Sequence, residues 1–188
     1  ILKFKSTIVQ LSYWEKSTYF TSTDILIIGS GIVGLFAALE IKKSNPKLKV
    51  LIIERGSLPT GASTKNAGFA CFGSPGELLD DIAYSTEKEV INLVTKRIKG
   101  LTKLRKTLGD KTIDYKGYGG FEVFDNESDF EKCAQQLSYL NNLIKENTGI
   151  HQTYTIADAN IKTMGFKEVK HLIHNLYEGQ INTGSMMK

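Results

Sequence analysis

Cysteine is scarce in this chain, which has only Cys71 and Cys133 among its 188 residues. The two stand far apart, in no spacing typical of a metal site or a disulfide framework. Because the cytosol keeps thiols reduced, we predict a cytoplasmic protein with reduced cysteines. His171 and His174 are spaced like neighbours on one helix turn but have no carboxylate or third ligand beside them, so we predict that no metal is bound.

Long apolar runs are also lacking, and none reaches the roughly 18 residues that indicate a membrane-spanning helix. Near the start of the chain, Lys3, Lys5, Glu15 and Lys16 interrupt the short apolar stretches, which argues against a signal peptide. The first residue is Ile1 rather than methionine, and we interpret it as a trimmed native start.

A strong excess of charge of either sign is absent, since the net charge at pH 7 is +4. The basic residues are scattered along the helical segments, and no basic strip is interleaved with aromatic residues. We therefore predict no nucleic-acid partner.

What the sequence does contain is an ordered stretch at residues 24–55, DILIIGSGIVGLFAALEIKKSNPKLKVLIIER. The apolar run 25–28 predicts a strand, and the glycine-rich turn 29–34 leads into a helix-forming segment. A second apolar run at 50–53 predicts another strand that ends on Glu54. This order indicates an α/β fold with a Rossmann-type βαβ unit.

Each glycine of the turn has a mechanical reason. Gly29 lets the chain turn sharply off the strand, Gly31 lets main-chain amides approach a pyrophosphate, and Gly34 lets the helix pack against the sheet. The pyrophosphate would lie at the positive end of the helix dipole. Glu54 can accept hydrogen bonds from a ribose 2′-hydroxyl and would repel a 2′-phosphate, so the pattern favours FAD or NAD over NADP.

A long loop at residues 56–76 follows the second strand. Connections of this length in compact domains are usually functional. Ser63, Thr64 and Asn66 offer hydrogen-bond donors to a phosphate or a flavin, and Ala67 and Gly68 allow close backbone approach.

The combination of DILIIGSGIVGL, LIIER and GASTKNAG resembles the FAD-dependent oxidoreductases of the D-amino-acid oxidase superfamily, particularly D-amino-acid dehydrogenase and the glycine or sarcosine oxidase-like branch. The resemblance implies that the turn holds the FAD pyrophosphate, that Glu54 holds the ribose and that Arg55 lies near the adenine. It also implies that the loop from Ser63 to Gly68 runs towards the isoalloxazine ring. The candidate cofactor-binding residues are Gly29, Gly31, Ile32, Val33, Gly34, Glu54, Arg55, Ser63, Thr64, Asn66, Ala67 and Gly68.

The resemblance further implies that an amino acid or related amine is oxidised at its CH–NH bond by hydride transfer to the flavin. No residue in this chain identifies the substrate or a catalytic group. Three alternatives stay open, namely an NAD-dependent dehydrogenase, a non-catalytic flavin-binding fragment and a flavin enzyme that modifies tRNA bases.

Beyond the loop, apolar periodicity predicts helices at 77–84, 87–108 and 129–147, and strands at 113–115 and 121–124. Strands followed by a helix resemble the start of the family's substrate domain, in which an antiparallel sheet lies over the flavin.

We therefore predict the first part of an incomplete FAD-binding domain at 1–109, part of an antiparallel α+β substrate domain at 110–175, and a return segment at 176–188. Only two parallel strands are recognisable, and an isolated pair of strands is at best marginally stable. We expect the C-terminal half of a longer protein, or another chain, to complete the sheet.

Overall fold

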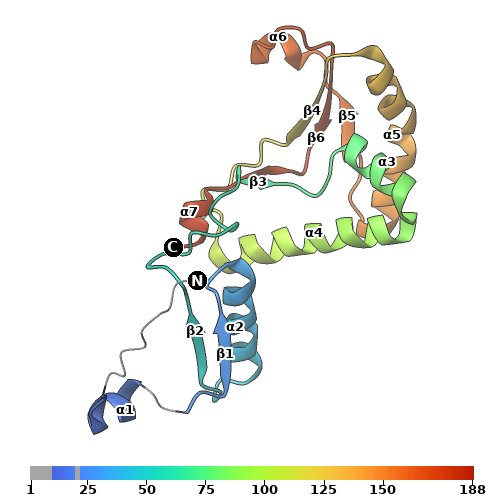
Figure 1. Ribbon diagram of the computed structural model, residues 1–188. Coiled ribbons are helices and arrows are strands. Elements are labelled where there is room, and N and C mark those ends of the chain that lie inside the picture. The colour runs from blue at the N-terminus through green and yellow to red at the C-terminus, as the bar shows by residue number, and fades with distance from the viewer. Residues whose placement is uncertain (1–9, 20–21) are drawn as a thin grey trace, which may run out of the picture. The chain divides into compact units, whose positions relative to one another are not determined.

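The computed structural model describes residues 10–19 and 22–188 and has a mixed α/β architecture, which confirms the predicted fold class (Figure 1). It divides into two compact units, Ile1–Thr64 and Lys65–Lys188. Within the described ranges, no helix is both long enough and apolar enough to cross a membrane.

The first unit contains the predicted βαβ arrangement. Helix α1 (Tyr13–Tyr19) precedes strand β1 (Ile25–Ile28), helix α2 (Ile32–Ser44) and strand β2 (Val50–Ile53). The two strands are parallel and pair in register from Ile25 with Val50 to Ile28 with Ile53. Figure 1 shows α2 running alongside both strands, which it contacts. The strand, turn, helix and strand predicted from residues 24–55 are therefore confirmed.

The two faces of this small sheet are unequally covered. Alternate strand residues point to opposite faces, and the half-buried set includes Ile25 and Ile27 on β1. The other set is exposed although it is entirely apolar, and consists of Leu26, Ile28, Leu51 and Ile53. Ile28 is 82% exposed.

The second unit holds the remaining helices and strands. In chain order these are β3 (Phe69–Ala70), α3 (Pro75–Tyr84), α4 (Glu87–Leu108), β4 (Gly120–Phe124), α5 (Glu127–Thr148), β5 (Tyr154–Ile156), α6 (Asn160–Met164), β6 (His171–Asn175), β7 (Gly179–Gln180) and α7 (Thr183–Met186). Strands β4, β6 and β5 form an antiparallel sheet in that order, and β3 pairs with β7.

The core of this unit lies where α3, α4 and α5 pack on one another and α5 packs on β4 and β5. Leu140 and Ile144 of α5 are fully buried there, with Val94 of α4 and Ile173 of β6. Apolar residues recur at three- and four-residue spacing along α4 and α5, so each helix buries one stripe. This periodicity is why both helices were predictable.

Some expected elements differ in the structure. The predicted strand at 113–115 is wrong, because this segment is a turn in which the Tyr115 N–H donates to the Asp110 carbonyl oxygen at 2.9 Å and Asp114 has φ +49°. His171 and His174 lie on strand β6 rather than on a helix turn. The loop at 56–76 also contains β3 and the first turn of α3. The domain boundaries at 109 and 175 remain predictions.

Candidate functional site

The glycine turn between β1 and α2 closes tightly. Gly29 has φ +98°, and its N–H donates to the Ile53 carbonyl oxygen at 2.7 Å, which ties the turn to the end of β2. A Cβ on Gly34 would lie 2.3 Å from the Gly29 carbonyl oxygen and 3.2 Å from Ile27 Cγ2. Only glycine therefore lets α2 start this close to the strand.

The first turn of α2 is the end of the helix at which the dipole favours a negative charge. Its N-cap, Gly31, has no side chain, and the turn carries no acidic residue that would compete with a bound anion. The Ile32 N–H donates to Ser63 Oγ at 3.0 Å, and a Cβ on Gly31 would lie 3.2 Å from the same oxygen. Val33 is 80% exposed. Ser63 thus reaches the head of α2 from the loop that follows β2.

Glu54 directly follows β2 and lies beside the turn. Its Oε2 accepts hydrogen bonds from Ser30 N at 2.9 Å and from Ser30 Oγ at 3.0 Å, and its Oε1 accepts from Gly56 N at 3.2 Å. These hydrogen bonds, above all that from the Ser30 backbone, lower the pKa of Glu54 to about 2. The exposed carboxylate is therefore ionised at neutral pH and held next to the glycine turn, while Arg55 follows it as an exposed residue.

The other loop residues have local contacts. Thr64 Oγ1 donates to the Pro59 and Gly61 carbonyl oxygens at 2.9 and 3.1 Å, which stabilises the loop in the first unit. In the second unit, Asn66 Oδ1 accepts from Gly68 N at 2.9 Å, and the Gly68 carbonyl oxygen accepts from Ile181 N at 2.8 Å. Gly68 has φ +76°, and a Cβ there would lie 2.3 Å from the Ile181 carbonyl oxygen, so glycine is required.

The structure thus brings part of the predicted site together within the first unit: Gly29, Gly31, Ile32, Val33, Gly34, Glu54 and Ser63. Ala67 is exposed and, with Asn66 and Gly68, belongs to the second unit. Sequence reasoning missed Ser30, which anchors Glu54 through two hydrogen bonds. A hydroxyl between two glycines of the turn was the available signal.

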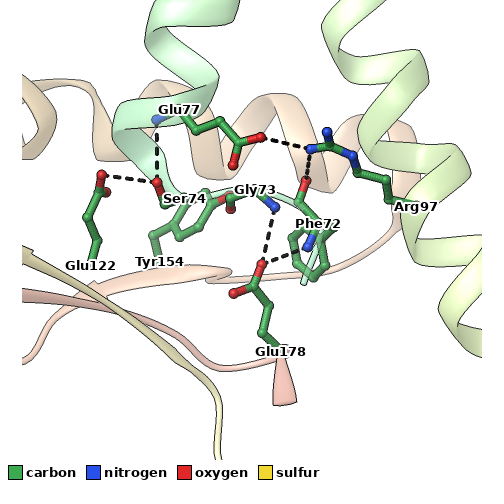
Figure 2. A network of polar contacts seen from close by, with 8 residues as sticks. All are labelled: Phe72, Gly73, Ser74, Glu77, Arg97, Glu122, Tyr154 and Glu178. Atoms are coloured by element: carbon green, nitrogen blue, oxygen red, sulfur yellow. Dashed lines mark hydrogen bonds and ion pairs between the residues drawn. The ribbon is translucent and has the colours of Figure 1, made fainter. Parts of the chain in front are cut away.

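A second group of polar residues surrounds the segment between β3 and α3 (Figure 2). Glu178 is only 7% exposed, and its Oε1 accepts from the N–H groups of Phe72 at 2.8 Å and Gly73 at 3.2 Å. Tyr154 donates its hydroxyl to the Gly73 carbonyl oxygen at 2.7 Å, and Arg97 donates to the Phe72 carbonyl oxygen at 3.2 Å. Burial raises the pKa of Glu178 despite the two backbone hydrogen bonds.

The cysteines differ in their surroundings. Cys133 is buried on α5, and desolvation raises its pKa to about 11. Cys71 is exposed, yet its pKa is raised, first by partial burial and then by the negative charges of Glu178 and Glu77. Neither cysteine is disulfide-bonded, and in the described part of the chain no three metal-binding side chains cluster.

The protein-family model described as "FAD dependent oxidoreductase" matches this chain over residues 24–187. Among curated proteins, the mitochondrial L-2-hydroxyglutarate dehydrogenase of Dictyostelium discoideum is 30% identical over 132 residues, which is 70% of this chain and 26% of that protein.

Solved structures are similar at lower identity. Glycine oxidase from Bacillus cereus ATCC 14579 has a TM-score of 0.55 and 19% identity over 88% of this chain and 42% of its own. L-Proline dehydrogenase from P. horikoshii has a TM-score of 0.57 and 18% identity over 88% of this chain and 40% of its own. At these identities the likeness concerns the fold. The chain spans less than half the length of each of these proteins.

Proposed function

The chain belongs to the family of FAD-dependent oxidoreductases, and on this premise we propose that it is part of an enzyme that oxidises the CH–NH bond of an amino acid or a related amine. The family uses FAD, which decides the choice between FAD and NAD that the glycine turn left open. The observation that carries the FAD part of this proposal is the ionised Glu54, held by Ser30 beside the N-terminus of α2, whose N-cap Gly31 has no side chain.

The residues of the first unit fit a dinucleotide. A Cβ on Gly31 would lie 3.2 Å from Ser63 Oγ and would fill space at the N-terminus of α2. The first turn of this helix carries no acidic residue. An anionic diphosphate is favoured at such a helix end, because the main-chain N–H groups and the helix dipole both point towards it. A carboxylate fixed at the glycine turn by Ser30 matches the ribose hydroxyls, which are hydrogen-bond donors.

We assign the following roles to the chain's own residues. The main-chain N–H groups at the start of α2, together with the Ser63 hydroxyl, hold the diphosphate. Glu54 accepts hydrogen bonds from the adenosine ribose, and Arg55 lies towards the adenine. In the second unit, the loop formed by Asn66, Ala67 and Gly68 approaches the flavin ring with its backbone. When bound, FAD supplies the two-electron acceptor for the substrate hydride, while the protein contributes orientation and charge.

Amine oxidation is favoured by the loop sequence GASTKNAG, on which the resemblance to glycine and sarcosine oxidase-like proteins depends. Glycine oxidase and L-proline dehydrogenase are also among the similar folds. A second candidate is oxidation of a 2-hydroxy acid, because the curated relative with 30% identity is an L-2-hydroxyglutarate dehydrogenase. Both reactions remove a hydride from a carbon that carries a polar hydrogen-bond donor, so the FAD site alone does not separate them.

The test is anaerobic reduction of the flavin in the purified full-length protein. Sarcosine, glycine, L-proline and L-2-hydroxyglutarate are added separately, and loss of the flavin absorbance band is followed. We expect at least one amine to bleach the flavin. Bleaching by the hydroxy acid alone supports the second candidate, and a full-length protein that cannot be loaded with FAD contradicts both.

A further inference from the structure

The segment 66–76 is held in the second unit by a part of the chain that comes more than 100 residues later. The Ile181 N–H donates to the Gly68 carbonyl oxygen at 2.8 Å, and β3 pairs with β7 over two residues. Strand β3 is short, and its Phe69 is 76% exposed, so little of its own packing stabilises it. The position of this segment therefore depends on its contacts with residues 178–181.

Glu178 extends this attachment beyond the end of the strand pairing. It directly precedes β7, and its Oε1 accepts hydrogen bonds from the N–H groups of Phe72 at 2.8 Å and Gly73 at 3.2 Å (Figure 2). Phe72, Gly73 and Glu178 are all buried. Buried backbone N–H groups are costly to leave unpaired, so the carboxyl oxygen of Glu178 is required at this place.

The carbonyl oxygens of the same two residues are held by side chains as well. The Tyr154 hydroxyl of β5 donates to the Gly73 carbonyl oxygen at 2.7 Å, and Arg97 of α4 donates to the Phe72 carbonyl oxygen at 3.2 Å. Gly73 has φ +139°, a conformation that favours glycine. All four main-chain polar groups of Phe72 and Gly73 are thus bound, and these residues form a fixed anchor for the segment.

The anchor lies close in sequence to the loop to which we assign the flavin ring. Only three residues separate Gly68 from Phe72. A connection this short has little freedom to absorb a displacement, because consecutive Cα atoms are a fixed distance apart. A Cβ on Gly68 would overlap the Ile181 carbonyl oxygen, so the loop is also closely packed against the later segment. A shift at Phe72 and Gly73 is therefore passed on to Gly68.

We propose that Glu178 is a positioning residue for the flavin, because its hold on Phe72 and Gly73 fixes the backbone of Ala67 and Gly68 against the isoalloxazine ring. The proposal rests on the proposed function, which assigns that loop to the ring. Hydrogen bonds and charges beside a cofactor tune its electronic properties, so the position of this backbone contributes to the reduction potential of the flavin. The role requires an acceptor oxygen, since both hydrogen bonds are made by one oxygen of the carboxyl group.

The flavin itself reports on this role when Glu178→Gln and Glu178→Leu are compared in the FAD-loaded full-length protein. Glutamine keeps an oxygen for the two N–H groups, whereas leucine removes the acceptor. We expect both variants to bind FAD through the first unit. The absorption spectrum and midpoint potential of Glu178→Gln should match the wild type. In Glu178→Leu, the spectrum should change and the equilibrium between oxidised and reduced flavin should shift roughly tenfold, which is about 30 mV for a two-electron couple.

Amide hydrogen exchange of the same proteins shows whether the segment has loosened locally. We expect the amides of residues 66–73 to exchange faster in Glu178→Leu than in the wild type and Glu178→Gln. Amides of α5 serve as the internal reference for a general loss of stability. Glu146→Leu, which changes an exposed residue of α5, is the matched control and should behave like the wild type in both measurements.

An unchanged spectrum and potential in folded, FAD-loaded Glu178→Leu would overturn the proposal and leave Glu178 a purely structural role, even if exchange is faster. A Glu178→Gln protein that is altered as much as Glu178→Leu would also overturn it. If Glu178→Leu does not fold, Tyr154→Phe decides the question, because it removes only the hydroxyl that holds the Gly73 carbonyl oxygen. We expect a smaller shift in this variant, and no shift would overturn the proposal. Failure of the proposed function is seen separately, as a wild-type protein that cannot retain FAD.

Discussion

Ser30 shows how one small residue can fix the position of Glu54, the residue to which we assign ribose binding. Its N–H and its hydroxyl both donate to the same oxygen of Glu54, and these hydrogen bonds keep the carboxylate ionised and fixed. Because the pKa of Glu54 is about 2, the charge is available to a ribose across the whole physiological pH range.

Replacement of this carboxylate tests its role. In Glu54→Gln the side chain keeps one acceptor oxygen, and its amide nitrogen must face either an N–H donor of Ser30 or Gly56 or a ribose hydroxyl. We therefore expect the FAD affinity of the full-length protein to fall roughly tenfold. Affinity is measured by fluorescence titration of the apoprotein with FAD. The matched variant Glu146→Gln, on an exposed part of α5, should bind FAD like the wild type; equal affinities in all three proteins would contradict the role given to Glu54.

Single residues differ in how far the sequence reveals them. Glu54 was predictable because it closes an apolar run at a fixed distance from a glycine turn. Glu178 was not, since its partners Phe72 and Gly73 lie more than 100 residues away and only the fold brings them together.

At the scale of elements, β6 is joined to its neighbours by a histidine. His171 Nδ1 contacts Asp158 at 2.8 Å, its Nε2 contacts Glu127 at the start of α5 at 3.1 Å, and its ring stacks on Phe130 with 3.8 Å between centroids. The hydrogen bond with Asp158, followed by that with Glu127, raises the pKa of His171.

This arrangement predicts a pH-dependent stability. A raised folded-state pKa means that the stabilisation is fully present below the unfolded value of about 6.5 and is lost as pH rises through the higher folded value. We expect the urea concentration at the unfolding midpoint of the wild type to decrease as the pH rises from about 6 to about 9. In His171→Gln, the part of this decrease that is due to His171 should be absent. His151→Gln is the control, and an identical pH profile for His171→Gln and wild type would refute the prediction.

Elements with strong periodicity were predictable, whereas weakly patterned ones were not. Helices α4 and α5 each carry a long apolar stripe, and Thr86 with Glu89 forms the capping box that starts α4. The segment 113–115 reads as a strand because its residues alternate, but the Arg105 guanidinium stacks over the Tyr115 ring at 3.8 Å and pairs with Asp110, which favours a compact turn after α4. Tertiary contacts of this kind override local preference.

At the scale of the molecule, the apolar face of the β1–β2 sheet is exposed, and we therefore expect other residues to complete this sheet. Leu26, Ile28, Leu51 and Ile53 form one continuous face, and parallel sheets are normally covered on both sides. We propose that the C-terminal half of the same protein, or another chain, covers this face and adds strands at its edges.

Hydrogen exchange tests this completion. We expect the amides of 25–28 and 50–53 to exchange at least tenfold more slowly in the full-length protein than in the isolated 1–188 chain, because strand edges and the open face are then covered. Amides of α5, whose core lies within the second unit, serve as the internal reference. Equal protection of β1 and β2 in both proteins would show that the pair needs no further cover.

The flavin content of purified full-length Gly31→Val protein shows whether the head of α2 holds the diphosphate of FAD. The new side chain begins 3.2 Å from Ser63 Oγ, in the space where the diphosphate must lie. Gly61→Val is the matched control, because a Cβ there has no atom within 4 Å. We predict a yellow wild type and control, each with close to one FAD per chain, and a colourless Gly31→Val protein that stays folded. Normal FAD content in Gly31→Val would show that the head of α2 does not hold the diphosphate.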